Sequence, residues 1–163
     1  MARFPLTKTA LLLAVTLVIQ MGGFPQPITG PLVNTMLYIA SLAVGITGGV
    51  LIGALTPIIA FFRGILAPPL APAIPFIILG NATLVIIFGT LHRNRPLAIL
   101  AASLLKYLVL GIAVRFIIEV PGPVAIALQT PQLITALAGG AIAWLLHRPL
   151  VNAGVIEEQD GLN

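Results

Sequence analysis

The amino-acid sequence predicts an all-α integral membrane protein with about six transmembrane helices and both termini in the cytoplasm. Of its 163 residues, 59% are hydrophobic and only 7% are charged, whereas soluble domains carry about 25% charged residues. Uncharged stretches run over Thr9–Phe62, Gly64–Leu91 and Val120–Leu146, and one crossing helix needs about 20 apolar residues. The length allows one domain. Together these observations exclude a soluble enzyme, a disordered chain and a coiled coil.

Several kinds of chemistry are also excluded by the residues that the chain lacks. The sequence has no cysteine, so it has no disulfide, thiolate metal site or cysteine nucleophile. No catalytic constellation and no Walker A pattern is visible, so we expect no enzymatic activity, no cofactor, no metal site and no ATP hydrolysis by the chain itself. Eight Lys and Arg residues give a net charge of +4, but they are spread through apolar sequence and predict no nucleic-acid partner.

Glycine and proline divide the uncharged stretches into individual helices. The first helix is expected at Leu6–Met21, where two glycines and a proline-containing loop end it. The following stretch, Pro31–Phe62, has a weak point at its glycines 45 to 49, and a turn with three prolines comes after it. Three more helices are expected, at Ala73–Leu91, Pro96–Ile118 and Pro131–Leu146.

The topology depends on whether Pro31–Phe62 crosses the membrane once or twice. Basic residues favour the cytoplasmic side, and they cluster at the N-terminus (Arg3, Lys8), in the loop 92–95 and at Arg148. Two short helices of roughly 15 residues, fewer than the usual span, place all of these clusters on the cytoplasmic side, so we predict a hairpin. Residues 1–150 are then one transmembrane domain, and residues 151–163, with three of the four acids, a short cytoplasmic tail.

On this topology most uncharged hydrogen-bonding side chains fall in the outer half of the bundle. Asn34 and Asn81 lie near the outer ends of apolar helices, Gln26 lies in the first outer loop, and Gln132 begins the last helix. Polar side chains in hydrocarbon face the protein interior or a wet cavity, so their convergence at one depth predicts a pocket open to the outside. The alternatives are proximity to water at helix ends and hydrogen bonding between helices.

Basic side chains accompany these polar groups. Lys106 lies ten residues after Pro96, about 15 Å along a helix and so near the bilayer midplane. A lysine there marks a functional site, extends its amine toward water or pairs with a carbonyl. Arg115 and Glu119 are four residues apart and could pair at the interface. At 100° per residue, Lys106 and Arg115 point to opposite faces. Because bases outnumber acids here, a ligand with a carboxylate or phosphate is favoured.

The candidate substrate-binding residues share this outer location. They are Gln26, Asn34, Asn81, Lys106, Arg115 and Gln132. A second candidate surface lies on the first helix, where Ala10 and Ala14 are four residues apart and form a flat strip that lets another helix approach closely.

Three short motifs give the chain a family resemblance. They are Lys8-Thr9-Ala10-x-x-x-Ala14, Thr29-Gly30-Pro31-Leu32-Val33-Asn34 and the segment Pro75–Asn81, which opens a helix. With the six-span size, they make residues 5–148 resemble the substrate-binding S component of energy-coupling factor (ECF) transporters. The vitamin-specific residue sets of well-known members are absent, as is the N-terminal metal-binding motif of the cobalt and nickel members.

The resemblance implies an S-component-like bundle and a transport function. Such a component captures a vitamin-like small molecule at its outer face, under the loops Gly22–Gly30 and Ala67–Pro72. It then docks through the Ala10/Ala14 face onto a membrane coupling subunit that carries two cytoplasmic ATPases, and topples to bring the pocket inward. The implied location is a prokaryotic cell membrane, with lipid around the bundle. The alternatives are a structural or assembly membrane protein without a small ligand, and a solitary passive carrier of the same fold.

Overall fold

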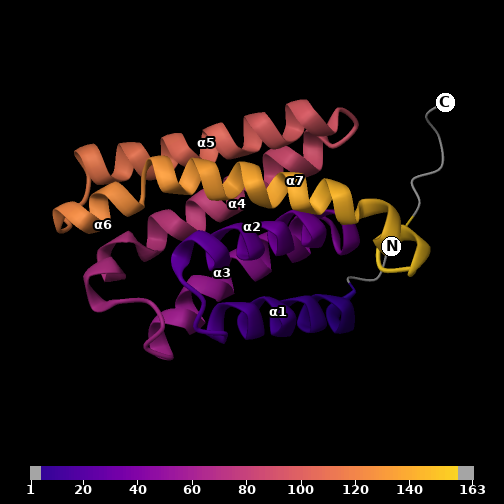
Figure 1. Cartoon of the computed structure of the whole chain (residues 1–163), viewed down its shortest axis with the longest axis horizontal. Helices are drawn as coiled ribbons and strands as arrows, with labels where there is room; N and C mark the ends of the chain where they lie inside the picture. Colours follow the sequence, from indigo (N-terminus) through magenta and orange to yellow (C-terminus); the bar gives the residue numbers. More distant parts are fainter. Residues whose placement is uncertain (1–4, 158–163) are drawn as a thin grey trace.

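The computed structural model describes residues 5–157, and this range is an antiparallel bundle of helices without a β-strand (Figure 1). The long helices are α1 (Leu6–Met21), α2 (Gln26–Ala43), α3 (Gly45–Phe62), α4 (Ile74–Leu91), α5 (Arg95–Phe116) and α7 (Thr130–Asn152). A 3₁₀ helix, η1 (Pro68–Ala73), leads into α4, and the short α6 (Gly122–Ala127) precedes α7. The predicted all-helical membrane bundle is thereby confirmed.

The predicted hairpin within Pro31–Phe62 is also confirmed. Only Val44 separates α2 from α3, and Gly45 follows it with a φ of +75°, a conformation that glycine adopts without steric cost. The two helices then run antiparallel and close together: a Cβ on Gly49 would lie 3.3 Å from the backbone nitrogen of Ser41, and one on Gly53 would lie 3.4 Å from the Leu37 side chain.

Helix α2 is the centre of the bundle and contacts α1, α3, α4 and α7. Every residue from Asn34 to Ser41 is buried, as expected for a helix that is surrounded by protein. Four stretches are long and apolar enough to cross a membrane: 45–62, 68–91, 95–116 and 122–152. Helix α1 is apolar but has only 16 residues, and α2 carries more polar residues because its neighbours shield it from lipid.

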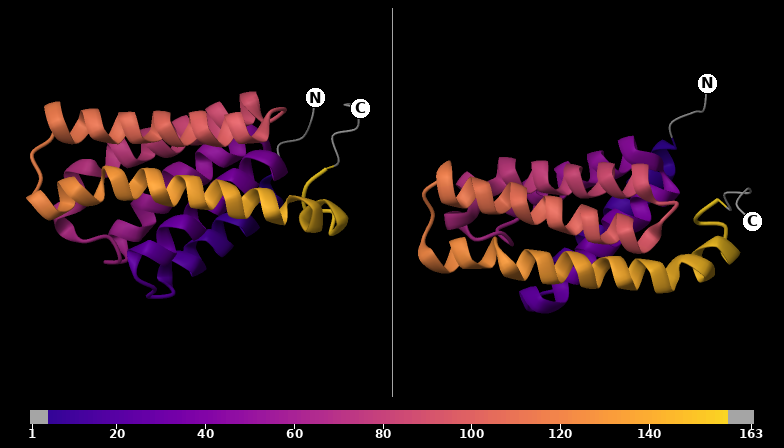
Figure 2. Two further views of the ribbon diagram at one scale, coloured as in Figure 1. Left: turned by 45° about the horizontal axis from the view of Figure 1, so that its top comes forward. Right: turned by 90° about the horizontal axis from the view of Figure 1, so that it is seen from above.

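Both ends of the described chain lie at one end of the bundle, which we call the terminal end (Figures 1 and 2). The turn between α4 and α5 lies there too, whereas the connections after α1, α3 and α5 lie at the opposite end. Basic residues at the terminal end are Lys8, Arg93, Arg95 and Arg148, against Arg63 and Arg115 at the opposite end. This charge bias assigns the terminal end to the cytoplasm.

The last helix is longer than the sequence predicts. Helix α7 continues past Leu146 to Asn152, because charged side chains mark where a helix leaves the hydrocarbon and do not end its hydrogen bonds. Beyond it the chain folds back, with the backbone N–H groups of Val155 and Ile156 donating to the Leu150 carbonyl. Ile156 is buried. The remainder of the predicted tail, residues 158–163, lies outside the described residues.

Candidate functional site

A buried lysine joins three helices near the middle of the bundle. The Lys106 Nζ of α5 lies 2.7 Å from Oδ1 of Asn34 on α2 and 2.9 Å from Oδ1 of Asn81 on α4. All three residues are at most 4% exposed. The lysine therefore does not extend toward water. Its ammonium has three N–H donors, and within the described residues two of them have acceptors.

Both asparagines are oriented by hydrogen bonds from their amide nitrogens. Asn81 Nδ2 donates to the Gly53 carbonyl at 2.9 Å. Asn34 Nδ2 donates to the Gly30 carbonyl at 3.0 Å and to the Thr135 hydroxyl at 3.4 Å. Because the nitrogens are engaged in this way, the amide oxygens face Lys106. Five helices, α2, α3, α4, α5 and α7, thus contribute to a single hydrogen-bonded cluster, which we call the Lys106 cluster.

Two glycines allow the helix backbones to approach this cluster. A Cβ on Gly139 of α7 would lie 2.7 Å from both the Asn34 Cβ and the Pro31 carbonyl oxygen, closer than non-bonded atoms tolerate. A Cβ on Gly53 of α3 would lie 3.0 Å from the Asn81 Cβ. These small residues at the helix interfaces let the asparagines reach backbone carbonyls and the lysine.

A cavity of about 90 Å³ adjoins the cluster on the side of the opposite end. Five of the six predicted site residues line it: Gln26, Asn34, Asn81, Lys106 and Gln132. The cavity walls also include Gln20, Thr29, Gly30, Val33, Thr56, Pro57, Leu66 and Ile77. Side chains that are far apart in the sequence are therefore gathered at the depth where the sequence predicts a pocket.

Arg115, the sixth predicted residue, does not line this cavity. It is exposed on α5 and lines a separate groove with Tyr107 and Gln129. Within the described chain it also forms no ion pair with Glu119, because α5 ends at Phe116 and the helical face that they would share ends with it. Instead the Arg115 guanidinium lies 6.0 Å from the centre of the Phe116 ring. Arg115 is therefore not brought together with the other candidates.

The first outer loop is shorter than predicted, and this moves several polar residues onto helices. Helix α2 begins at Gln26, so Gln26 and Thr29 are helical, with Gln26 exposed and Thr29 buried. The predicted second covering loop, Ala67–Pro72, is largely the 3₁₀ helix η1. Of the residues before η1, Leu66 lines the cavity.

Two polar residues of the cavity wall, one on α1 and one on α3, are not among the predicted site residues. Gln20, at the end of α1, contributes a buried Oε1 that has no hydrogen-bond partner in the described residues. Thr56 of α3 is buried and donates to the Ile52 carbonyl of its own helix at 2.7 Å. The sequence does not indicate that such a threonine lines a cavity. A threonine within an apolar helix commonly donates its hydroxyl to the carbonyl four residues earlier.

The cavity wall carries positive charge without a nearby acid. Lys106 is the one charged residue among those that line it. Of the acids in the described residues, Glu119 and Glu157 are both exposed and neither lines the cavity. In the described range no group of three His, Asp or Glu residues is placed to hold a metal ion.

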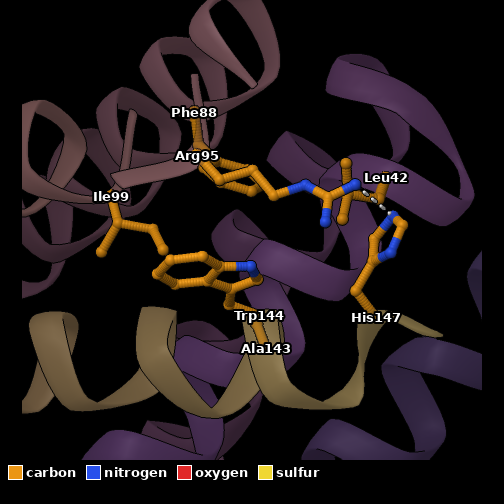
Figure 3. Close-up of a pocket in the computed structure, with 7 residues that line it drawn as sticks. All are labelled: Leu42, Phe88, Arg95, Ile99, Ala143, Trp144 and His147. Atoms are coloured by element: carbon orange, nitrogen blue, oxygen red, sulfur yellow. Dashed lines mark hydrogen bonds between the residues drawn. The ribbon is translucent and has the colours of Figure 1, made fainter. Parts of the chain in front are cut away.

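A second polar contact lies at the terminal end and joins α5 to α7 (Figure 3). The Arg95 guanidinium lies 3.0 Å from Nε2 of His147, and Trp144 lies beside the arginine and Ile99 in Figure 3. The space between these side chains is only about 10 Å³, about the volume that a single water needs. This contact clamps the helix ends together and leaves no room for a substrate.

Helix α1 presents a continuous apolar face away from the bundle. Thr9, Leu12 and Thr16 are buried, whereas Ala10 and Ala14 are exposed. Several large apolar side chains of α1 are also exposed: Leu6, Leu11, Val15, Val18 and Met21. The predicted small-residue strip therefore lies on a face that no other helix within residues 5–157 covers.

The fold and the cavity define the chain as a multi-pass α-helical membrane protein with a polar cavity between its helices. A family model described as "ECF transporter, substrate-specific component" matches residues 5–152, and the chain belongs to this family. It is thus a substrate-specific membrane component of energy-coupling factor transporters. No curated protein and no solved structure matches the chain.

Proposed function

We propose that this chain captures a vitamin-like small molecule in the cavity beside Lys106 and delivers it to an ATP-driven importer. The observation that carries the proposal is the convergence of five helices on one buried cation and two oriented amides next to a cavity. Polar groups that converge on a concave site between helices, with a charged residue among them, are typical of small-molecule sites. The substrate contacts are then Gln26, Asn34, Asn81, Lys106 and Gln132. Arg115 is not among them, because it lines a different groove.

The orientation of the bundle supports capture from outside the cell. The cavity is displaced from the Lys106 cluster toward the end that lacks the termini, and the basic residues favour the terminal end as cytoplasmic. We propose a prokaryotic cell membrane as the location, residues 1–150 as the transmembrane domain and residues 151–163 as a short cytoplasmic tail.

The uncovered face of α1 supports docking on a membrane coupling subunit with two cytoplasmic ATPases. Ala10 and Ala14 are exposed and four residues apart, so a partner helix can approach their backbone closely. The chain itself contains no phosphate-binding loop, so any ATP that drives transport is hydrolysed by other chains.

The strongest rival is a purely structural role for the Lys106 cluster. In favour of it, the amide nitrogens of both asparagines are bonded to backbone carbonyls, as in polar contacts that hold membrane helices together. The rival predicts that the cavity stays empty and that loss of an asparagine lowers only stability.

Native mass spectrometry of the whole protein in detergent separates the two roles. We expect a stoichiometric small molecule on the wild-type protein. Asn81→Leu removes one polar group from the cavity wall and one of the two acceptors that orient Lys106 toward a ligand. If the ligand loses hydrogen bonds worth about 1–3 kcal/mol, its Kd rises by roughly 5- to 150-fold, and occupancy should fall.

Tyr38→Phe is the matched control for this prediction. Tyr38 is buried and its hydroxyl lies 3.0 Å from the Ser103 hydroxyl oxygen, but it does not line the cavity. Its loss should lower stability by about 1 kcal/mol and leave occupancy unchanged. A wild-type protein that is empty and transports nothing with coupling subunits and ATP would refute the proposed function.

A further inference from the structure

We infer that the substrate of this chain carries an anionic group, a carboxylate or a phosphate, that binds at Lys106. The inference rests on the proposed function, because it takes the cavity beside Lys106 as the substrate site. It adds the chemical class of the ligand, which membership of the family leaves open.

The first argument is charge balance. Lys106 is 4% exposed, and the other residues that line the cavity are uncharged. Its two contacts are neutral amide oxygens, which supply partial charges and no counter-charge. Buried charges in proteins are paired with an opposite charge or coordinate a metal, and no acidic side chain of the described chain faces Lys106. An anionic substrate supplies that charge, whereas a cationic one is repelled.

The second argument is the geometry of the donors. Two N–H groups of Lys106 point to Asn34 and Asn81, which leaves the third without an acceptor in the described residues. The amide nitrogen of each asparagine donates to a backbone carbonyl. Rotating either amide would break that bond, so both amide oxygens stay directed at Lys106. The cluster therefore holds the ammonium in place and leaves one donor for a ligand atom.

The third argument is the set of donors around the cavity. The side-chain amides of Gln26 and Gln132 line it and have no hydrogen-bond partner within the described residues. A carboxylate or phosphate has several acceptor oxygens and can accept from the ammonium and an amide together. A neutral carbonyl can accept the free N–H of Lys106 but leaves its charge without a counter-charge.

The test uses the full chain in detergent and pairs of probes that differ in one group. The pairs are nicotinate with nicotinamide, lipoate with lipoamide, and pyridoxal 5′-phosphate with pyridoxal, each measured by thermal shift and binding isotherm. In parallel, any molecule that co-purifies with the wild-type protein is identified by mass spectrometry. We expect that molecule to carry a carboxylate or phosphate, and every pair that binds to favour its anionic member by at least about tenfold.

Substitutions of Lys106 test whether this residue causes the tighter binding of the anionic probes. Lys106→Gln should remove the preference for the anion, whereas Lys106→Arg should retain it because the charge is kept. Arg115→Gln is the control, since it removes a cation from the same half of the bundle but outside the cavity, and it should leave the preference intact. If neither Lys106 variant folds, the wild-type pairs and the co-purified molecule decide the question.

The outcomes distinguish this inference from the proposed function. A neutral or cationic co-purified ligand, equal binding of paired probes, or a preference that survives Lys106→Gln overturns the inference and leaves the capture function standing. A protein that carries no ligand, binds no probe and drives no uptake with coupling subunits and ATP overturns both. Binding of inorganic phosphate or chloride alone would also overturn the inference, because it shows a small-ion site and not a substrate anchor.

Discussion

Ala14→Trp is expected to abolish uptake by the assembled transporter while the isolated chain still binds its substrate. Ala14 is exposed on the uncovered face of α1, so the indole meets no atom of this chain's core and leaves the cavity unchanged. Under the proposed docking, the same indole stands between α1 and the coupling subunit. Overpacking of such a contact costs about 1–3 kcal/mol, which lowers docking affinity by roughly 5- to 150-fold.

The measurement is substrate uptake into proteoliposomes that contain the coupling subunit and both ATPases, alongside a binding isotherm for the isolated chain. Ala141→Trp is the matched control, because Ala141 is also an exposed alanine but lies on α7. It should preserve both uptake and binding. Unimpaired uptake by Ala14→Trp, or loss of its binding, would contradict docking through this face.

Gly139→Val is expected to disrupt the bundle itself. An added Cβ would lie 2.7 Å from the Pro31 carbonyl oxygen and 2.9 Å from the backbone nitrogen of Thr35. Because these are backbone atoms, no side-chain rotation relieves the clash, and α7 must move away from α2. The expected loss of stability is about 3 kcal/mol, with loss of ligand because Asn34 is displaced.

Gly111→Val provides the control for this prediction. Gly111 also lies within a helix, but a Cβ there meets no atom within 4 Å, so the substitution should leave stability and binding nearly unchanged. Both variants are compared by apparent Tm in detergent and by ligand occupancy in native mass spectrometry. Equal Tm values would show that α2 and α7 separate at little cost, contrary to the packing described above.

Local features of the chain were readable before the structure was known. The bounds of α1 agree residue for residue with the prediction, because a proline before a helix and glycines after it act over only a few bonds. The division of Pro31–Phe62 into two helices followed from the distribution of basic residues. The error at the end of α7 arose because charge was taken as a helix boundary.

The candidate site was predictable only as a list of residues at one depth. Helical periodicity correctly separated Arg115 from Lys106, yet both remained candidates because the sequence does not show which face of α5 meets the bundle. The predicted pairing of Arg115 with Glu119 failed for a similar reason, since it required α5 to continue past Phe116. Gln20 and Thr56 were missed as cavity residues because polar side chains at helix ends or within apolar runs are common for other reasons.

The sequence by itself determined that the chain is a membrane bundle, where its helices break, and which polar residues lie in its outer half. These properties depend on composition and on short-range effects of glycine, proline and charge. Only the tertiary structure decided that Lys106 meets Asn34 and Asn81, which are 72 and 25 residues away in the chain. That meeting depends on how closely α2, α3 and α7 approach, which Gly53 and Gly139 permit through contacts between distant segments.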